Sequence, residues 1–163
     1  MKLGLVSDTH GNAQRLERAL ELLRARGIEA VVHCGDLGSE QILAVLGNAS
    51  VPAYAVLGNV DYGADLLEAA RRYGVTLSRE SVEVAIGGGH YLVATHGHHQ
   101  ALLDSLILGG QFPYVCHGHT HRRRDDRIGA VRVINPGALQ RAAVHTVAVL
   151  DTTADTVEFI AIA

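Results

Sequence analysis

The stretch Leu3-Gly4-Leu5-Val6-Ser7-Asp8-Thr9-His10, close to the N-terminus, decides the fold of this chain. Its first half is a short apolar run of the kind that forms a buried strand, and a helical pattern follows from Asn12 to about Arg26. Its second half ends in a carboxylate and an imidazole, two groups that bind metal ions. A strand that ends in such residues and leads into a helix is typical of α/β folds, whose active sites lie at the carboxyl ends of strands.

The same arrangement recurs along the chain. Most of the other ligand-type residues also follow short apolar runs, in the segments Gly35-Asp36, Gly58-Asn59-Val60-Asp61, His96-Gly97-His98 and His117-Gly118-His119-Thr120-His121. We therefore expect these side chains to meet at one edge of a sheet.

The first half alternates strands and helices. Strands are predicted over 28–33 and 53–57, and helices over 39–46, with Ser39 as N-cap, and 64–73. Gly27, Gly47 and Gly74 are the expected helix stops. This alternation implies parallel pairing through right-handed crossovers.

The second half has a different pattern. Strands over 82–86 and 91–95 flank three glycines and form a predicted hairpin, and a helix is expected over 100–108. Further strands are predicted over 114–116, 131–134, 145–150 and 156–162. The chain is thus expected to be a single α/β domain over 1–163, with two sheets and helices outside them.

Composition narrows the class of protein. The 163 residues are 48% apolar and 19% charged, as in a compact domain, and the formal charge of −3 argues against binding nucleic-acid polymers. Only two cysteines occur, and no apolar run is long enough to be a signal peptide or to span a bilayer. We expect a cytoplasmic protein without a membrane partner, and the oligomeric state is left open, a homo-oligomer included.

Each ligand-type segment is unremarkable when taken alone. Asp8 and His10 would point the same way if the extended backbone continued, but such a pair more often belongs to a turn or a helix cap. Asp36 and Asn59, each after a glycine, also fit turns. Their joint order is what indicates a metal site. Carboxylates, an amide and imidazoles suit two transition-metal ions and phosphoryl chemistry, whereas a structural zinc site would be expected to contain cysteines.

The order D-x-H, G-D, G-N-x-D, H-G-H, G-H-x-H resembles the calcineurin-like metallophosphoesterase superfamily, and its small bacterial and archaeal phosphodiesterase branch in particular. Asn135-Pro136-Gly137 is a further match, and the resemblance extends from Met1 to about Asp151. It implies a four-layer α/β/β/α sandwich of two mixed β-sheets flanked by helices.

The resemblance also implies the ligands. Asp8, His10 and His121 would hold a first metal ion. Asn59, His96 and His119 would hold a second, with Asp36 bridging the two. Mn²⁺ is the expected ion, with Ni²⁺, Co²⁺, Fe or Zn²⁺ as alternatives.

One position departs from the superfamily pattern. Val60 stands where many members have a histidine thought to stabilise the transition state or protonate the leaving group. Asn59 and His98 are then the candidates for catalytic roles, although His98 could equally orient a ligand or be merely exposed. Small phosphodiesterases of the branch also lack this histidine. Ala138, where the branch commonly has serine, is a second difference.

Other residues receive simpler interpretations. His33 and His117 are expected to point away from the site, Cys34 and Cys116 to lie in the core, and His99 to cap a helix. The mixed-charge segment 122–127 is expected to form a solvated hairpin, with a substrate-facing arginine as the less favoured alternative.

The predicted function is a metal-dependent phosphodiesterase that hydrolyses a small phosphodiester with metal-activated water at a binuclear centre. Two alternatives stay open. One is a phosphomonoesterase or nucleotidase on the same centre. The other is a metal-binding scaffold for partner proteins, since retromer contains a subunit of this fold.

Overall fold

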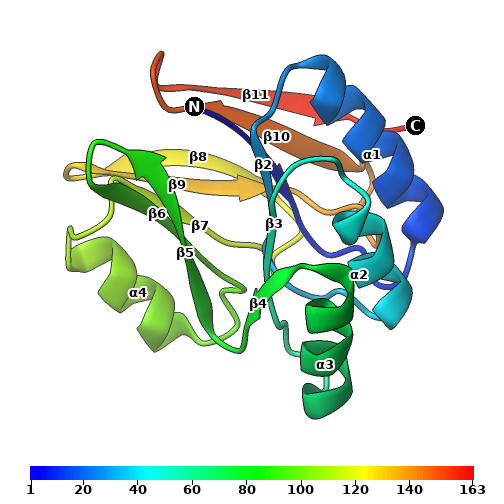
Figure 1. Cartoon of the computed structure of the whole chain (residues 1–163). Coiled ribbons are helices and arrows are strands. Elements are labelled where there is room, and N and C mark those ends of the chain that lie inside the picture. Colours follow the sequence, from blue (N-terminus) through cyan, green and yellow to red (C-terminus); the bar gives the residue numbers. More distant parts are fainter.

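The computed structural model describes residues 1–163 and contains two mixed β-sheets packed face to face, with helices on both outer sides (Figure 1). The predicted four-layer α/β/β/α sandwich is confirmed. No helix in the structure combines the length and apolar character needed to cross a membrane.

The first sheet has six strands in the order β11-β10-β1-β2-β3-β4. Their bounds are β1 Lys2–Val6, β2 Ala30–His33, β3 Ala53–Val56, β4 Thr76–Ser78, β10 Thr146–Asp151 and β11 Thr156–Ala161. Strands β1 to β4 run parallel, as the strand–helix alternation predicts, and β10 joins β1 antiparallel. The three-residue strand β4 was not expected, because it is too short to show a periodic pattern.

The second sheet has five strands in the order β5-β6-β7-β9-β8. Their bounds are β5 Ser81–Gly87, β6 His90–Thr95, β7 Tyr114–Cys116, β8 Arg123–Ile128 and β9 Val131–Pro136. Both expected hairpins are present, since β5 pairs with β6 and the exposed β8 pairs with β9. Strands β6, β7 and β9 run parallel.

Helices α1 Ala13–Ala25, α2 Glu40–Gly47 and α3 Gly63–Tyr73 cover the first sheet, and α4 Gln100–Leu108 covers the second (Figure 1). Three apolar clusters fill the three interfaces between layers. One joins α1–α3 to the first sheet, one lies between the sheets, and one joins α4 to the second sheet.

Strand β1 shows how alternation builds these layers. Leu3 and Leu5 point into the cluster between the sheets, whereas Val6 belongs to the cluster beneath the helices. Gly4 also faces the helices, where a Cβ would lie 3.0 Å from side-chain atoms of Leu23 and Ile28. A glycine at this position therefore lets α1 pack closely on the sheet.

Candidate metal centre

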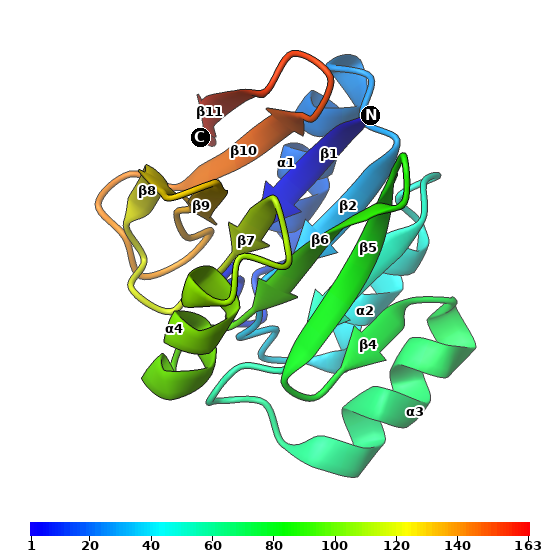
Figure 2. The same ribbon diagram turned by 90° about the vertical axis from the view of Figure 1, so that its left-hand side faces the viewer.

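The parallel strands of both sheets end at the same edge of the sandwich, as the arrowheads of β1, β2 and β6 show in Figure 2. Asp8, Asp36 and Asn59 lie in the loops after β1, β2 and β3. His96 and His119 follow β6 and β7. The predicted meeting of these segments at one edge is therefore what the topology produces.

Four side chains form what we call the first donor group: Asp8, His10, Asp36 and His121. One ligand atom from each lies within 4.8 Å of all the others. The His121 Nε2 atom is 3.1 Å from Asp8 Oδ1 and 3.5 Å from His10 Nε2. The His10 Nε2 atom is 3.6 Å from Asp36 Oδ2. Two carboxylates and two imidazoles thus converge on one point.

An unpartnered oxygen shows that this group fits a cation. Asp8 Oδ2 accepts hydrogen bonds from the Ser7 hydroxyl at 2.6 Å and the His119 amide at 3.2 Å. Asp8 Oδ1 is buried and has no hydrogen-bond partner. A buried, unsatisfied carboxylate oxygen is costly, and a metal ion bound among these donors would satisfy it.

A second donor group consists of Asn59, His96 and His119 together with the other oxygen of Asp36. Asn59 Oδ1 lies 3.0 Å from His96 Nε2 and 3.1 Å from His119 Nδ1. Asp36 Oδ1 lies 3.3 Å from His96 Nε2. The two oxygens of Asp36 therefore face the two donor groups, one each.

Two imidazoles are oriented by backbone carbonyls. The Nδ1 atom of His96 lies 2.8 Å from the Cys34 carbonyl oxygen, and that of His121 lies 3.1 Å from the Arg141 carbonyl oxygen. Donation of Nδ1–H to these acceptors leaves Nε2 unprotonated and directed at the donor groups. Such hydrogen bonds fix the tautomer that a metal ligand requires.

The electrostatics of the site keep Asp36 ionised. Burial by itself would raise the pKa of Asp36, but its contact with the His96 imidazole and the hydrogen bond from the Val60 amide lower it to about 2. Burial would lower the pKa of His96, yet its contact with Asp36 and its bond to the Cys34 carbonyl raise it. Burial lowers the pKa of His10, and the positive charge of Arg141 acts in the same direction.

Asp61 ties two of the loops together. Its carboxylate accepts hydrogen bonds from the amides of Leu37, Gly38 and Gly58 at 2.8–2.9 Å. This links the loop that carries Asp36 to the loop that carries Asn59. Asp61 therefore holds two ligand-bearing loops in place without facing the donor groups itself.

Two supporting residues were not identified from the sequence. Asn135 donates to the Gly118 carbonyl at 2.9 Å and to the Thr120 hydroxyl at 3.1 Å, which shapes the loop between His117 and His121. The carbonyl oxygen of Arg141 accepts the hydrogen bond from His121 Nδ1. The motif Asn135-Pro136-Gly137 was the available signal, since it contains the first of these residues and lies shortly before the second.

The backbone at the ligands differs from the expectation. Asp8 and His10 are not in extended conformation but have φ values of 52° and 43°. Asp36, His119 and His121 are also left-handed, with φ of 56°, 69° and 58°. The premise of a continued strand was therefore wrong. Asp8 and His10 converge because left-handed residues fold the loop, which backbone hydrogen bonds join to the loop after β2.

The remaining histidines lie around the centre. His98 is exposed, with its ring centroid 5.3 Å from that of His96 and 6.2 Å from that of His119. His33 and His117 are buried and contact Thr9 and Arg124. His99 occupies the N-cap of α4 without a side-chain hydrogen bond, so the expected cap is absent. Cys34 and Cys116 lie in the core as predicted.

Comparison with known proteins agrees with this geometry. Residues 1–155 match the family model of the calcineurin-like phosphoesterase superfamily domain. The chain belongs to this superfamily. The expected enzyme class, a hydrolase of the calcineurin-like superfamily, is thereby confirmed.

Members of the superfamily with known sequence or structure resemble the chain over nearly its whole length. Phosphodiesterase MJ0936 of Methanocaldococcus jannaschii is 31% identical over 159 residues, 93% of each chain. The solved structure of an archaeal phosphodiesterase has a TM-score of 0.88 and 31% identity over 99% of both chains. The structure of the Escherichia coli phosphoesterase Yfce covers both chains fully, with a TM-score of 0.67 and 22% identity, and shares the fold.

Proposed function

We propose that this member of the superfamily is a metal-dependent phosphodiesterase that hydrolyses a small phosphodiester at a binuclear centre, within a single catalytic domain of residues 1–163. The observation that carries the proposal is the position of Asp36, whose two oxygens face separate donor groups. Metal ions about 3.5–4 Å apart need such a shared ligand.

Each donor then has a role. Asp8, His10 and His121 hold the first ion, Asn59, His96 and His119 hold the second, and Asp36 bridges them. When bound, the two ions lower the pKa of a water molecule and neutralise charge on the phosphoryl oxygens. The imidazoles favour Mn²⁺, Ni²⁺, Co²⁺, Fe or Zn²⁺ over Mg²⁺ and Ca²⁺, and we favour Mn²⁺.

Val60 favours a diester as the substrate, because the small phosphodiesterases that the chain resembles also lack a histidine at this position. Its side chain can neither donate a proton nor stabilise charge, although its amide donates to Asp36. His98 is the candidate proton donor in its place, because it is exposed beside His96 and His119. General acid catalysis contributes about 10²–10⁴ in rate, so weak acid assistance favours esters with good leaving groups.

Steady-state hydrolysis of bis(p-nitrophenyl) phosphate with Mn²⁺ tests the proposal. Asn59→Ala and His119→Ala should each lose at least about 10²-fold in kcat/KM, because each removes a ligand of the second ion. His90→Ala is the matched control, since His90 is exposed at the start of β6, away from the edge that carries the ligands. Absence of Mn²⁺-dependent turnover, or full activity in both variants, would contradict the proposal.

The same preparation separates the alternatives. Faster hydrolysis of p-nitrophenyl phosphate than of the diester would indicate a monoesterase. Metal binding without hydrolysis of any ester would indicate a scaffold. We also propose a cytoplasmic location, which two free thiols buried between the sheets support.

A further inference from the structure

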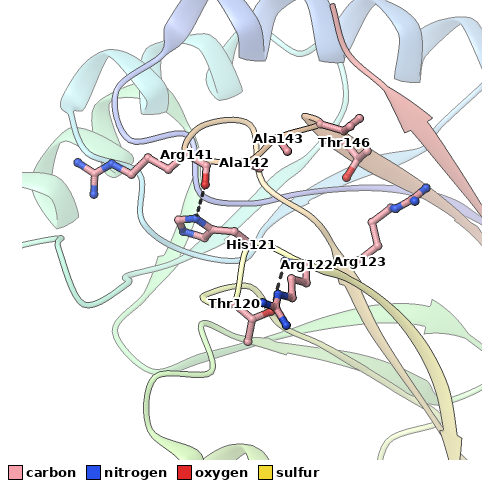
Figure 3. A pocket seen from close by; sticks show the side chains of 9 residues that line it. Thr120, His121, Arg122, Arg123, Arg141, Ala142, Ala143 and Thr146 are labelled. Carbon is pink, nitrogen blue, oxygen red and sulfur yellow. Dashed lines mark hydrogen bonds between the residues drawn. The ribbon is translucent and has the colours of Figure 1, made fainter.

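A cavity of about 560 Å³ adjoins the first donor group (Figure 3). One wall is the segment that leads into β8, and the other is the loop between β9 and β10. Its lining includes the proposed ligand His121, three arginines at 122, 123 and 141, and the small residues Ala142 and Ala143. We call this cavity the arginine pocket.

The arginines of this pocket lack carboxylate partners. Arg122, Arg123 and Arg141 form no ion pair, whereas Arg124, Arg127 and Arg132 on the same hairpin are all paired with aspartates. Three arginines without an ion-pair partner thus line one cavity of a chain whose net charge is −3. The pocket is therefore a positive region beside the metal centre.

The three guanidinium groups lie on two sides of His121. Figure 3 shows the Arg141 side chain on one side of His121 and those of Arg122 and Arg123 on the other, where Arg122 lies beside Thr120 and Arg123 extends away from it. The Arg141 carbonyl oxygen lies 3.1 Å from His121 Nδ1, so this residue borders the first donor group. Arg123 lies over the Phe159 ring at 5.5 Å, which restrains its side chain without occupying its N–H groups.

The size of the pocket exceeds what a single phosphate needs. Small-molecule sites typically have volumes of about 300–1,000 Å³. Ala142 and Ala143 leave room along one wall, and Val144 adds an apolar edge that is 62% exposed. An organic group with further negative charge fits these properties better than an inorganic ion does.

On the basis of the proposed function, we propose that the substrate is a phosphodiester that carries a second phosphate on one of its ester groups. The second phosphate binds between Arg122 and Arg123, whose exposed side chains turn toward it from the directions drawn in Figure 3, while the scissile diester lies on the side of Arg141. Guanidinium groups match phosphate oxygens in pairs, and a phosphate monoester carries almost two negative charges. A carboxylate offers one negative charge on two oxygens, whereas a phosphate monoester offers almost two charges on three oxygens.

Two matched substrates test this proposal. Both are p-nitrophenyl esters of thymidine 5′-phosphate, one with a free 3′-hydroxyl and one with a 3′-phosphate. In the wild-type protein, kcat/KM should be about tenfold or more higher for the 3′-phosphorylated ester. The preference should disappear in Arg122→Ala/Arg123→Ala and persist in part in Arg122→Lys/Arg123→Lys. Arg24→Ala, an exposed arginine on α1, controls for net charge.

Calorimetric binding of thymidine 3′,5′-bisphosphate and thymidine 5′-monophosphate gives a second readout. If the bisphosphate binds more tightly and the double alanine variant loses this difference, the arginine pocket binds the second phosphate. This holds even in a preparation that hydrolyses no ester. Equal affinities, or equal kcat/KM for the two esters, overturn it. Turnover of bis(p-nitrophenyl) phosphate by the wild type then shows separately that the proposed phosphodiesterase activity stands.

Discussion

At the scale of single residues, the proposed ligands have unusual backbone conformations. Eight non-glycine residues have positive φ, and Asp8, His10, Asp36, His119 and His121 are five of them. Arg141, whose carbonyl orients His121, is another. Such conformations cost about 1–3 kcal/mol each and gather at functional sites, where the surrounding structure holds them. The strain at this edge is thus an independent sign of function.

Gly58 allows the two loops of the centre to approach each other. A Cβ at this position would collide with the Oδ1 and amide nitrogen of Asp36. Gly58→Ala should therefore displace Asp36 and weaken Mn²⁺ binding by about 10–100-fold, which calorimetry measures.

Gly129→Ala is the control, because Gly129 has φ of 60° but no atom within 4 Å of an added Cβ. It should reduce stability through backbone strain yet keep Mn²⁺ affinity. Equal Mn²⁺ affinity in both variants would contradict the argument.

His98 can be tested through the leaving group. If it protonates the departing oxygen, His98→Ala should lower kcat for diphenyl phosphate by about 10²-fold and affect bis(p-nitrophenyl) phosphate much less. The reason is that p-nitrophenolate leaves readily without a proton. Equal losses on the two diesters would show that His98 acts only on the structure of the site.

At the scale of elements, the N-termini of two helices differ in a way that stability can measure. The Asn12 side chain accepts a hydrogen bond from the Arg15 amide at 3.0 Å and caps α1. Ser39 occupies the N-cap of α2, but its hydroxyl is buried and has no partner. Sequence pattern alone predicted a cap at Ser39, and the structure does not contain its hydrogen bond.

Urea unfolding should therefore separate the two positions. Asn12→Ala should lower the free energy of unfolding by about 1 kcal/mol, because it removes a cap. Ser39→Ala should change it by less than about 0.5 kcal/mol or raise it, because it removes an unsatisfied buried hydroxyl. Similar losses at both positions would contradict the different roles.

At the scale of the whole molecule, two buried histidines couple stability to pH. Burial, with the nearby His96, lowers the pKa of His33 to about 3. Burial and the positive charge of Arg124 lower the pKa of His117 to about 4. The hydrogen bond to the Gly118 carbonyl offsets part of this effect. Both rings are neutral in the fold, where His33 Nδ1 accepts from the Gly35 amide and His117 Nε2 accepts from Arg124.

The direction of the pH effect follows from proton linkage. The unfolded chain binds protons at both histidines below pH about 6.5, whereas the folded protein does not until pH about 3–4. Stability should therefore be greatest above pH about 6.5 and fall on acidification, by about 1.4 kcal/mol per pH unit for each histidine. Urea unfolding of metal-free protein at pH 7 and pH 5 measures this slope. His33→Gln and His117→Gln should each reduce it, and unchanged slopes in both would refute the assignment.

Much of the fold was predictable because burial leaves a local record in the sequence. Apolar runs, helical spacing and glycine stops located the four helices and most strands, and the helix over 100–108 has the predicted bounds. Strand β4 left no such record, because three residues at a sheet edge show no period. The order of the ligand segments predicted their common edge, because parallel strands place their carboxyl ends together.

The sequence by itself thus determined the layers, the superfamily and the set of candidate ligands, since these depend on local patterns and on residue identity. Only the tertiary structure decided how the ligands converge. The left-handed loops, the two faces of Asp36 and the arginine pocket all depend on contacts between segments far apart in the chain, such as His121 with Arg141 and Asp61 with Leu37. No local pattern encodes such contacts, because they exist only once the two sheets have packed together.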